Sequence, residues 1–147
     1  MTGQGGRVRA PVAAGSFYAG SADTLAGDVE DLLASARVEP VAAGEIVRGV
    51  VSPHAGYVYS GPIAASAYRF LRLAPNPARI VVLGPSHFEP LRGLAVTSAG
   101  SWRSPLGDLP IDQDGRSMLL GSGAMSADAP HRAEHSIEVQ LPFLQRC

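Results

Sequence analysis

The sequence predicts an α/β domain in a three-layer α/β/α arrangement around a mostly parallel central sheet. Two runs rich in β-branched residues, 46–51 and 79–83, lack the polar alternation of half-exposed strands, as expected for strands that are buried on both faces. Between them, the segment 60–72 has a proline near its start and good helix formers after it. Strand, helix and strand in this order form a βαβ unit, whose two strands are parallel.

The rest of the chain supplies further short elements. Ser21 can cap a helix over 22–36, in which apolar residues recur at helical spacing. Pro142 can interrupt or kink the last helix, because proline cannot donate the backbone hydrogen bond that a helix interior needs. The other predicted elements are a strand at 93–97, a turn-rich excursion at 102–107, a returning strand at 108–111, a helix from Asp112 and a helix over 131–141.

Composition excludes several classes of protein. A chain of 147 residues with 46% hydrophobic residues has the size and core of one domain. Its net charge is −1 and its basic residues, all arginines, form no cluster, so neither nucleic acid nor a membrane surface is an expected partner. We find no apolar run long enough to span a membrane and no signal-peptide core, which predicts a cytoplasmic protein. With Cys147 as its one cysteine, the chain forms no internal disulfide and no all-cysteine metal site.

Two histidines follow the two predicted parallel strands. His54 lies in a turn with Pro53, and His87 lies in a turn with Pro85. Because the carboxyl ends of parallel strands meet at one edge of a sheet, where ligands bind, the two imidazoles are expected to share a site. Such a pair suits a divalent metal. The alternative is a buried histidine that is hydrogen-bonded to a carbonyl group.

The C-terminal region contains two further histidines, His131 and His135. On a helix this spacing places both on one face, as in some zinc sites. His131 follows Pro130 and is expected at the surface before the helix begins. His135 is flanked by Glu134 and Glu138, so it is expected either to face a pocket, with Glu138 orienting it, or to lie on an exposed helix face.

Five sequence motifs together resemble one family. They are RAPVAAGSFYAG, VVSPHAGYVYSGPIAASAY, VVLGPSH, SWRSPLGDLPID and EHSIEVQLPFLQ. In their order and spacing the chain resembles, from Arg9 to Gln145, the Memo-like family, whose bacterial and archaeal members are called AmmeMemoRadiSam system protein B. That family is similar in fold to class III extradiol dioxygenases, such as the catalytic subunit of protocatechuate 4,5-dioxygenase, whose non-haem Fe(II) is held by two histidines and a glutamate.

The resemblance implies a metal site and a redox role. His54 and His87 fall at the positions of the family's two metal-binding histidines, and His135 joins them as a candidate catalytic residue. The implied cofactor is a divalent metal, with iron or copper favoured over zinc. Two other functions stay open: a peptide- or metal-binding protein without catalysis, and a zinc-dependent hydrolase in which a metal-bound water reacts.

The resemblance also implies that residues 1–147 form the N-terminal portion of a single domain. A third pocket residue of the family, a cysteine in a C-G motif, and an Asp/His pair lie in a C-terminal half, so Cys147 does not match that cysteine. The expected partners are a small molecule or a peptide in the pocket and a second copy in a homo-oligomer. A functional link to radical SAM and AMMECR-type proteins is implied by the family alone.

Overall fold

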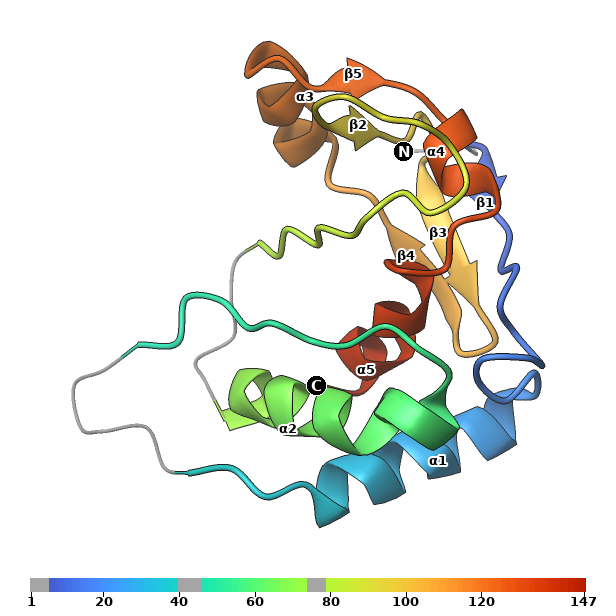
Figure 1. Ribbon diagram of the computed structural model, residues 1–147, viewed down its shortest axis with the longest axis vertical. Coiled ribbons are helices and arrows are strands. Elements are labelled where there is room, and N and C mark those ends of the chain that lie inside the picture. Colours follow the sequence, from blue (N-terminus) through green and yellow to red (C-terminus); the bar gives the residue numbers. More distant parts are fainter. Residues whose placement is uncertain (1–5, 40–45, 74–78) are drawn as a thin grey trace, which may run out of the picture.

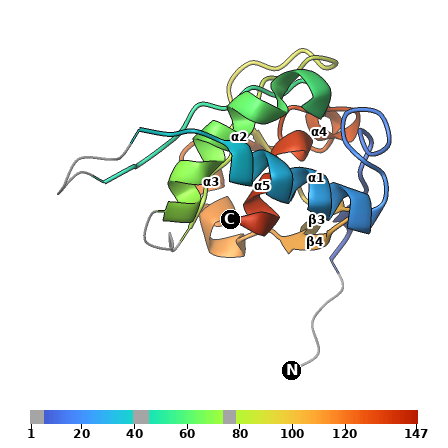
Figure 2. The same ribbon diagram turned by 90° about the horizontal axis from the view of Figure 1, so that it is seen from below.

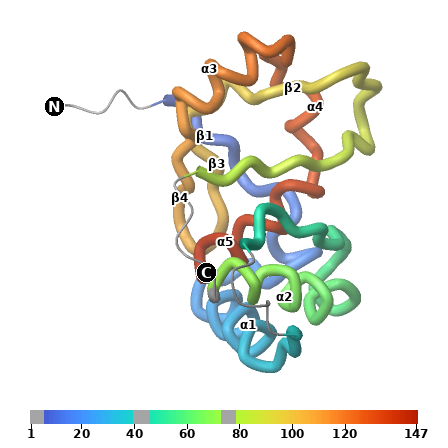
Figure 3. Tube along the Cα trace, turned by 90° about the vertical axis from the view of Figure 1, so that its left-hand side faces the viewer, coloured from blue at the N-terminus to red at the C-terminus, as the bar shows by residue number. Residues whose placement is uncertain are grey.

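Two long helices, α1 (Ala22–Ser35) and α2 (Tyr57–Leu73), pack against each other. They belong to a computed structural model that describes residues 6–39, 46–73 and 79–147 (Figure 1). Figure 1 shows the two helices together with the C-terminal helix at one end of the molecule, and Figure 2 looks at that end from below. The protein is thus α/β, with its helical core at this end and its small sheets toward the other (Figure 3).

Helix α1 confirms the predicted helix over 22–36. The Ser21 hydroxyl accepts a hydrogen bond from the Thr24 N–H, which satisfies one of the free donors at the start of the helix. Leu25, Val29 and Leu33 recur at helical spacing and are fully buried. The apolar stripe of the sequence is therefore the face that packs on the core.

Helix α2 confirms the helix predicted between the two β-branched runs, and it begins at Tyr57, ahead of the predicted segment 60–72. Pro62 lies inside the helix and cannot donate to the preceding turn. The buried face of α2 combines small residues, which let α1 approach closely, with two tyrosines. Its buried residues include Tyr57, Ser60, Ala64, Ala65 and Tyr68.

Two small sheets contain all the strands of the described residues. In the first, β1 (Val8–Arg9) pairs parallel with β3 (Ser101–Ser104), which pairs antiparallel with β4 (Gly107–Pro110). In the second, β2 (Ala95–Val96) pairs parallel with β5 (Met125–Ser126). Parallel pairs thus join distant parts of the chain, as an α/β fold requires.

The β3–β4 hairpin corrects the turn-rich excursion predicted at 102–107. Trp102 is a strand residue that pairs with Leu109, and both Trp102 and Ser104 are buried. Polar residues alternate with them, so the segment faces the core on one side only. The turn is short and ends at Gly107, whose φ of 121° is one that glycine adopts readily and other residues rarely adopt. The returning strand predicted at 108–111 is confirmed by β4, and the strand predicted at 93–97 contains β2.

Helix α3 (Gln113–Gly121) begins where the sequence predicts a helix from Asp112. The Asp112 carboxylate accepts hydrogen bonds from the backbone N–H groups of Asp114 and Gly115, both at 3.0 Å. This cap satisfies free donors of the first turn and explains the sharp start of the helix.

The single helix predicted over 131–141 is wrong. The Glu134 carboxylate accepts hydrogen bonds from the N–H groups of His135 and Ser136, which are therefore turned away from the preceding helical turn. The chain runs as a loop from Ala133 to Ile137. Three short elements stand in place of the helix: α4 (Ala129–Arg132), the 3₁₀ turn η1 (Glu138–Gln140) and α5 (Leu141–Arg146).

The two β-branched runs are present as extended chain rather than as strands. Segments 46–51 and 79–84 cross the molecule in the same direction in Figure 1, and neither is part of a sheet. Neither makes a backbone-to-backbone hydrogen bond to another described residue. A strand exists through its ladder of such bonds. The predicted parallel central sheet and three-layer arrangement are therefore not confirmed by the described residues.

The main core lies between α1, α2 and the C-terminal tail. Phe143 stacks on Tyr68 with ring centroids 5.1 Å apart and also contacts Tyr57. A smaller cluster forms around Trp102 and Leu141 beside the β3–β4 hairpin. No helix of the described residues is long and apolar enough to cross a membrane. The buried residues of the main core are Ala13, Tyr18, Leu25, Val29, Leu33, Tyr57, Ala64, Ala65, Tyr68, Val139 and Phe143.

The Asp128 side chain connects the two sheets. We expect Asp128→Asn to lower the free energy of unfolding at neutral pH by about 1 to 2 kcal/mol. Its carboxylate accepts from the Ser98 hydroxyl at 2.6 Å, the Ser98 N–H at 2.8 Å and the Thr97 hydroxyl at 2.9 Å, and it pairs with Arg7. Hydrogen bonds from Ser98 are the largest influence on the pKa of Asp128. Together with those from Arg7 and Thr97, they lower this pKa despite partial burial.

The sign of the pH dependence follows from that lowered pKa. The carboxylate contributes stability above its unfolded pKa of about 3.9, and this contribution is lost as the pH falls further, through the lower folded pKa. Urea unfolding of wild type and Asp128→Asn at several pH values should show a difference that shrinks below about pH 4. A difference that is constant with pH would contradict this ionic role.

Candidate metal centre

His54 lies in the loop that leads into helix α2, and this loop is held from two sides. The Ser60 hydroxyl donates to the Ala55 carbonyl at 2.8 Å, which fastens the loop to the first turn of the helix. From the C-terminal tail, the Gln140 amide donates to the Pro53 carbonyl at 3.1 Å. The backbone on each side of His54 is therefore fixed by a hydrogen bond.

His87 lies in the loop that follows segment 79–84, and the same tail holds it. The Ser136 hydroxyl donates to the Pro85 carbonyl at 2.9 Å, and the His87 N–H donates to the Glu134 carboxylate at 2.6 Å. Gly84 permits this approach, because a Cβ at that position would lie 2.5 Å from the Ser136 hydroxyl oxygen. The C-terminal tail thus holds both histidine loops, one through Ser136 and Glu134 and the other through Gln140.

Three imidazoles come together at this place. The ring centroids of His54 and His87 are 5.3 Å apart, and those of His87 and His135 are 4.9 Å apart with the rings nearly parallel. The ring of His54 lies 6.0 Å from that of His135. The cluster is reachable from solvent, since the His87 side chain is 40% exposed. Phe17 covers His135 from one side, with 4.5 Å between centroids.

The Glu134 carboxylate supports two of these rings from behind. It is almost fully buried and accepts from the His87 ring nitrogen Nδ1 at 2.9 Å and from the backbone N–H groups of His135 and Ser136. Burial alone would raise the pKa of Glu134, but the hydrogen bonds from His87 and Ser136 outweigh it and lower the pKa to about 2. Glu134 is therefore ionised at neutral pH and accepts hydrogen bonds only.

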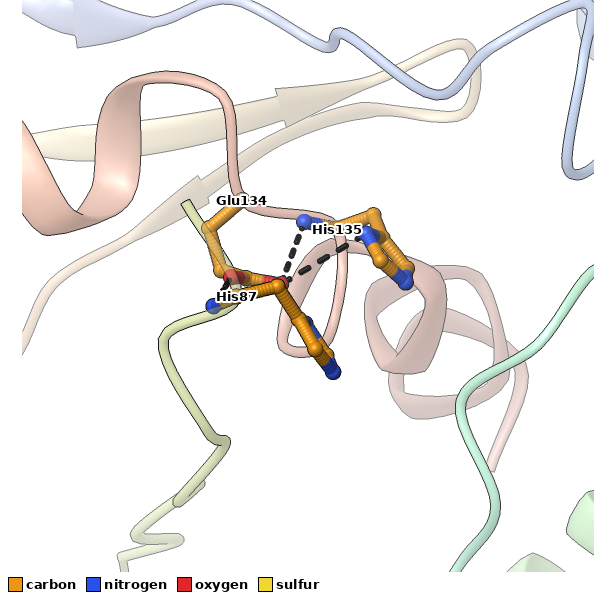
Figure 4. Close-up of side chains that lie close together, drawn as sticks. All are labelled: His87, Glu134 and His135. Atoms are coloured by element: carbon orange, nitrogen blue, oxygen red, sulfur yellow. Dashed lines mark hydrogen bonds and ion pairs between the residues drawn. The ribbon is translucent and has the colours of Figure 1, made fainter. Parts of the chain in front are cut away.

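This ionised acceptor fixes the tautomer of His87. Since Glu134 has no proton to give, the His87 Nδ1 carries the hydrogen of their bond, so in the neutral ring the free lone pair is on Nε2. Figure 4 shows the rings of His87 and His135 both extending away from Glu134. A carboxylate behind a histidine with its second nitrogen facing outward is the usual arrangement around a protein-bound metal ion.

His135 is held in its neutral form by its surroundings. Burial is the largest influence and lowers the pKa of His135, and the neighbouring imidazoles of His87 and His54 lower it further, while Glu134 opposes them. Metal ions bind the neutral imidazole, so the arrangement favours the protonation state that ligation needs.

The residues present fit a metal ion. His87, Glu134 and His135 each offer a ligand atom, and these atoms lie within 4.8 Å of one another. Two donors that bind one ion at about 2 Å each are at most about 4 Å apart, so binding requires only a small approach of the side chains. The Glu134 oxygens are already occupied by four donors. We therefore assign ligation to the free imidazole nitrogens and support to the carboxylate.

The structure corrects two expectations about the tail. His131 is buried rather than exposed, because α4 places its ring edge-on against Trp102 with centroids 5.6 Å apart. It does not share a helix face with His135, since α4 ends at Arg132. Glu138 does not orient His135, because its buried carboxylate pairs with Arg9.

Glu134 was missed by sequence reasoning. The assumed helix placed Glu138 on the same face as His135, whereas the real backbone forms a loop in which the adjacent glutamate reaches both histidines. The available signal was an acidic residue directly before a histidine in a segment with Pro130 upstream, which weakens the case for a long helix.

Histidines thus gather in loops that follow two extended segments of an α/β protein, and in α/β proteins ligands commonly bind beyond the ends of such segments. The family model described as "Memo-like protein" matches residues 9–147. A MEMO1 family protein of Methanopyrus kandleri is 40% identical over 93% of this chain, and one of Thermotoga neapolitana is 36% identical over 94%. The chain belongs to the Memo-like family.

The matches cover only part of each relative. This chain corresponds to 51% of the Methanopyrus protein, 53% of the Thermotoga protein and 52% of a MEMO1 family protein of Aeropyrum pernix, which is 36% identical over 95% of the chain. The chain thus spans about half the length of these curated relatives.

Proposed function

We propose that this chain contributes to a metal-binding Memo-like protein in which His54, His87 and His135 face one divalent metal ion. The observation that carries the proposal is the cluster of three imidazoles with ring centroids 4.9 to 6.0 Å apart, one of which is oriented by a buried carboxylate. Such convergence of neutral nitrogen donors on rigid loops is what a metal site requires.

Iron or copper is the favoured metal, and the favoured chemistry is redox. The family resemblance favours these metals, and imidazole ligands suit iron and copper, which His54, His87 and His135 supply. When bound, the metal would supply the electron transfer to dioxygen that a ring-cleaving reaction needs. The residues of this chain would hold the ion, favour the neutral form of His135 and leave one side open to a small molecule or a peptide.

A zinc-dependent hydrolase is the second candidate. It is favoured by the third imidazole, because three histidines with an open fourth position form a catalytic zinc site. In that case the residues of this chain would hold zinc, which lowers the pKa of a bound water to about 7. Elemental analysis of protein purified without added metal distinguishes the two candidates.

If His54 and His87 face one ion, His54→Ala and His87→Ala should each weaken metal binding nearly as much as the double substitution does. Two side chains that ligate one ion act as a unit, so their losses are not additive. We expect at least a tenfold loss for either single variant, on the order of the loss seen when one supporting contact of a metal site is removed. Calorimetric titration with Fe(II), Cu(II) and Zn(II) measures it.

The matched control is His131→Gln, which removes the one histidine that lies outside the cluster. It should leave the metal affinity within about threefold of wild type, well below the tenfold loss expected at the site. Additive losses from His54→Ala and His87→Ala would instead indicate two independent histidines and would contradict the shared site.

A further inference from the structure

One buried glutamine, Gln140, joins two of the histidine loops. Its side-chain NH₂ group donates to the Pro53 carbonyl at 3.1 Å and to the Ser136 carbonyl at 3.3 Å. The Ser136 hydroxyl in turn donates to the Pro85 carbonyl at 2.9 Å. A continuous chain of hydrogen bonds therefore runs from the residue that precedes His54 to the other histidine loop.

The orientation of the Gln140 amide is fixed by its partners. The carbonyl groups of Pro53 and Ser136 can only accept hydrogen bonds, so the NH₂ group has to face them. The amide oxygen then faces the Tyr68 hydroxyl, which donates to it at 2.9 Å. Both polar atoms of this buried side chain thus have partners, as a buried amide requires.

Tyr68 gives this amide a rigid support. Its ring is buried on α2 and stacks on Phe143, with an interplanar angle of 6°. Burial raises the pKa of Tyr68 well above its usual value, so the hydroxyl keeps its proton and remains a donor. Gln140 is therefore anchored to the helical core and reaches from there to the histidine loops.

Glu134 holds two of the three imidazoles. It accepts from the ring and the backbone N–H of His87 and from the backbone N–H of His135. The third imidazole belongs to loop 52–56. In the described part of the chain, the one hydrogen bond between this loop and the C-terminal tail is the one that Gln140 donates. The position of the third ring relative to the other two therefore depends on the Gln140 amide.

We propose that Gln140 is a positioning residue that sets the distance of the His54 imidazole from the other two. It acts through the Pro53 carbonyl rather than as a ligand, because both of its amide donors are already used. The inference rests on the proposed function, since this spacing matters when three nitrogen donors face one ion. A preorganised site needs supporting side chains that are themselves fixed by packing and hydrogen bonds.

The first test uses the metal-free chain, in which NMR contacts between histidine ring protons report the arrangement of the rings. Gln140→Met keeps the length of the side chain and removes its donors and its acceptor. We expect weaker contacts of His54 with the other two rings, whose centroids lie 5.3 and 6.0 Å from its own. The contact between His87 and His135 should be unchanged, because Glu134 still holds both.

A double variant separates positioning from stability. Gln140→Met leaves the buried Tyr68 hydroxyl without its partner, which destabilises the fold whatever the role of the glutamine. Adding Tyr68→Phe removes that unpaired hydroxyl, so the urea midpoint should recover toward wild type. Zn(II) affinity should stay at least about tenfold below wild type, the loss typical when a supporting group of a metal site is removed.

The matched control is Tyr57→Phe. Tyr57 is a second buried tyrosine of α2, its ring also contacts Phe143, and its hydroxyl donates to the Val139 carbonyl at 2.8 Å. The variant thus loses a comparable buried hydroxyl whose hydrogen bond does not involve Gln140. The histidine contacts should persist, and Zn(II) affinity should stay within about threefold of wild type, well below the loss expected for a supporting group.

Three results would overturn the inference. The first is unchanged contacts of His54 in Gln140→Met or, where that variant does not fold, in the double variant. The second is an affinity that recovers together with stability in the double variant, and the third is an equal loss of affinity in Tyr57→Phe. Either of these two would make Gln140 a structural residue only. A wild type that binds no metal would contradict the proposed function instead, and the ring contacts of the metal-free chain would still test the positioning.

Discussion

Replacing Glu138 by glutamine is expected to lower the free energy of unfolding by about 3 kcal/mol. The Glu138 carboxylate is completely buried, pairs with the buried guanidinium of Arg9, and accepts from the Ala13 N–H at 2.8 Å and the Tyr18 hydroxyl at 2.7 Å. Glutamine preserves the shape but removes the charge, so the Arg9 cation stays buried without a counter-ion. Urea unfolding followed by circular dichroism measures the loss.

The control for this prediction is Glu30→Gln. Glu30 pairs with Arg72 at 3.1 Å and Arg146 at 3.0 Å, but all three side chains are more than one third exposed. Exposed ion pairs contribute about 0 to 1 kcal/mol, so this variant should unfold close to wild type. If Glu138→Gln were equally mild, the buried pair would not be the link between the N-terminal segment and the tail.

The helices could be predicted because their signals are local. Ser21 and Asp112 cap the first turns of α1 and α3 with their own side chains, and both caps are visible in the sequence. Periodic apolar residues then identify the buried face of α1. Such patterns need no knowledge of the rest of the fold.

The tail could not be predicted because its conformation depends on distant residues. The loop at 133–137 is fixed by Glu134, which bonds to His87 far away in the sequence. His131 is buried against Trp102, and the guanidinium of Arg9, which lies over the Trp102 ring, donates to the His131 carbonyl. Local periodicity contains no information on either contact, so the pattern of 131–141 suggested one continuous helix.

The convergence of His54 and His87 could be predicted from direction alone. Two segments that run the same way across a molecule end at the same side, and the residues that follow them meet there. That argument needs the order of the elements but not their hydrogen bonds. It therefore holds although segments 46–51 and 79–84 are unpaired in this structure.

Segments 46–51 and 79–84 were predicted to be strands, but their direction does not determine whether they pair with other strands. Absence of polar alternation indicates strands that are covered on both faces, and the described residues leave Val51 and Leu83 mostly exposed. The sequence pattern thus reports the environment for which these residues are suited.

If the proposed site binds metal, replacing Glu134 by glutamine is expected to weaken that binding by about 10- to 100-fold, because the group that orients the proposed ligand His87 loses its charge. Ionised Glu134 accepts from Nδ1 of His87 and thereby leaves Nε2 free to bind. A glutamine can turn its NH₂ group toward the ring and favour the other tautomer. Calorimetric titration of the variant with Fe(II) and Zn(II) measures the loss of affinity.

Glu134 could orient His87 or bind the metal itself, and the tautomer of His87 in metal-free protein distinguishes these two roles. Nitrogen-15 NMR should show the Nδ1–H form in wild type and a mixture in Glu134→Gln, whereas Glu89→Gln, in the same exposed loop, should resemble wild type in both tautomer and affinity. A merely structural role for Glu134 would lower stability without changing the tautomer ratio. If affinity fell while the tautomer stayed the same, the carboxylate would be a metal ligand itself, and the four hydrogen bonds to its oxygens would have to rearrange when the metal binds.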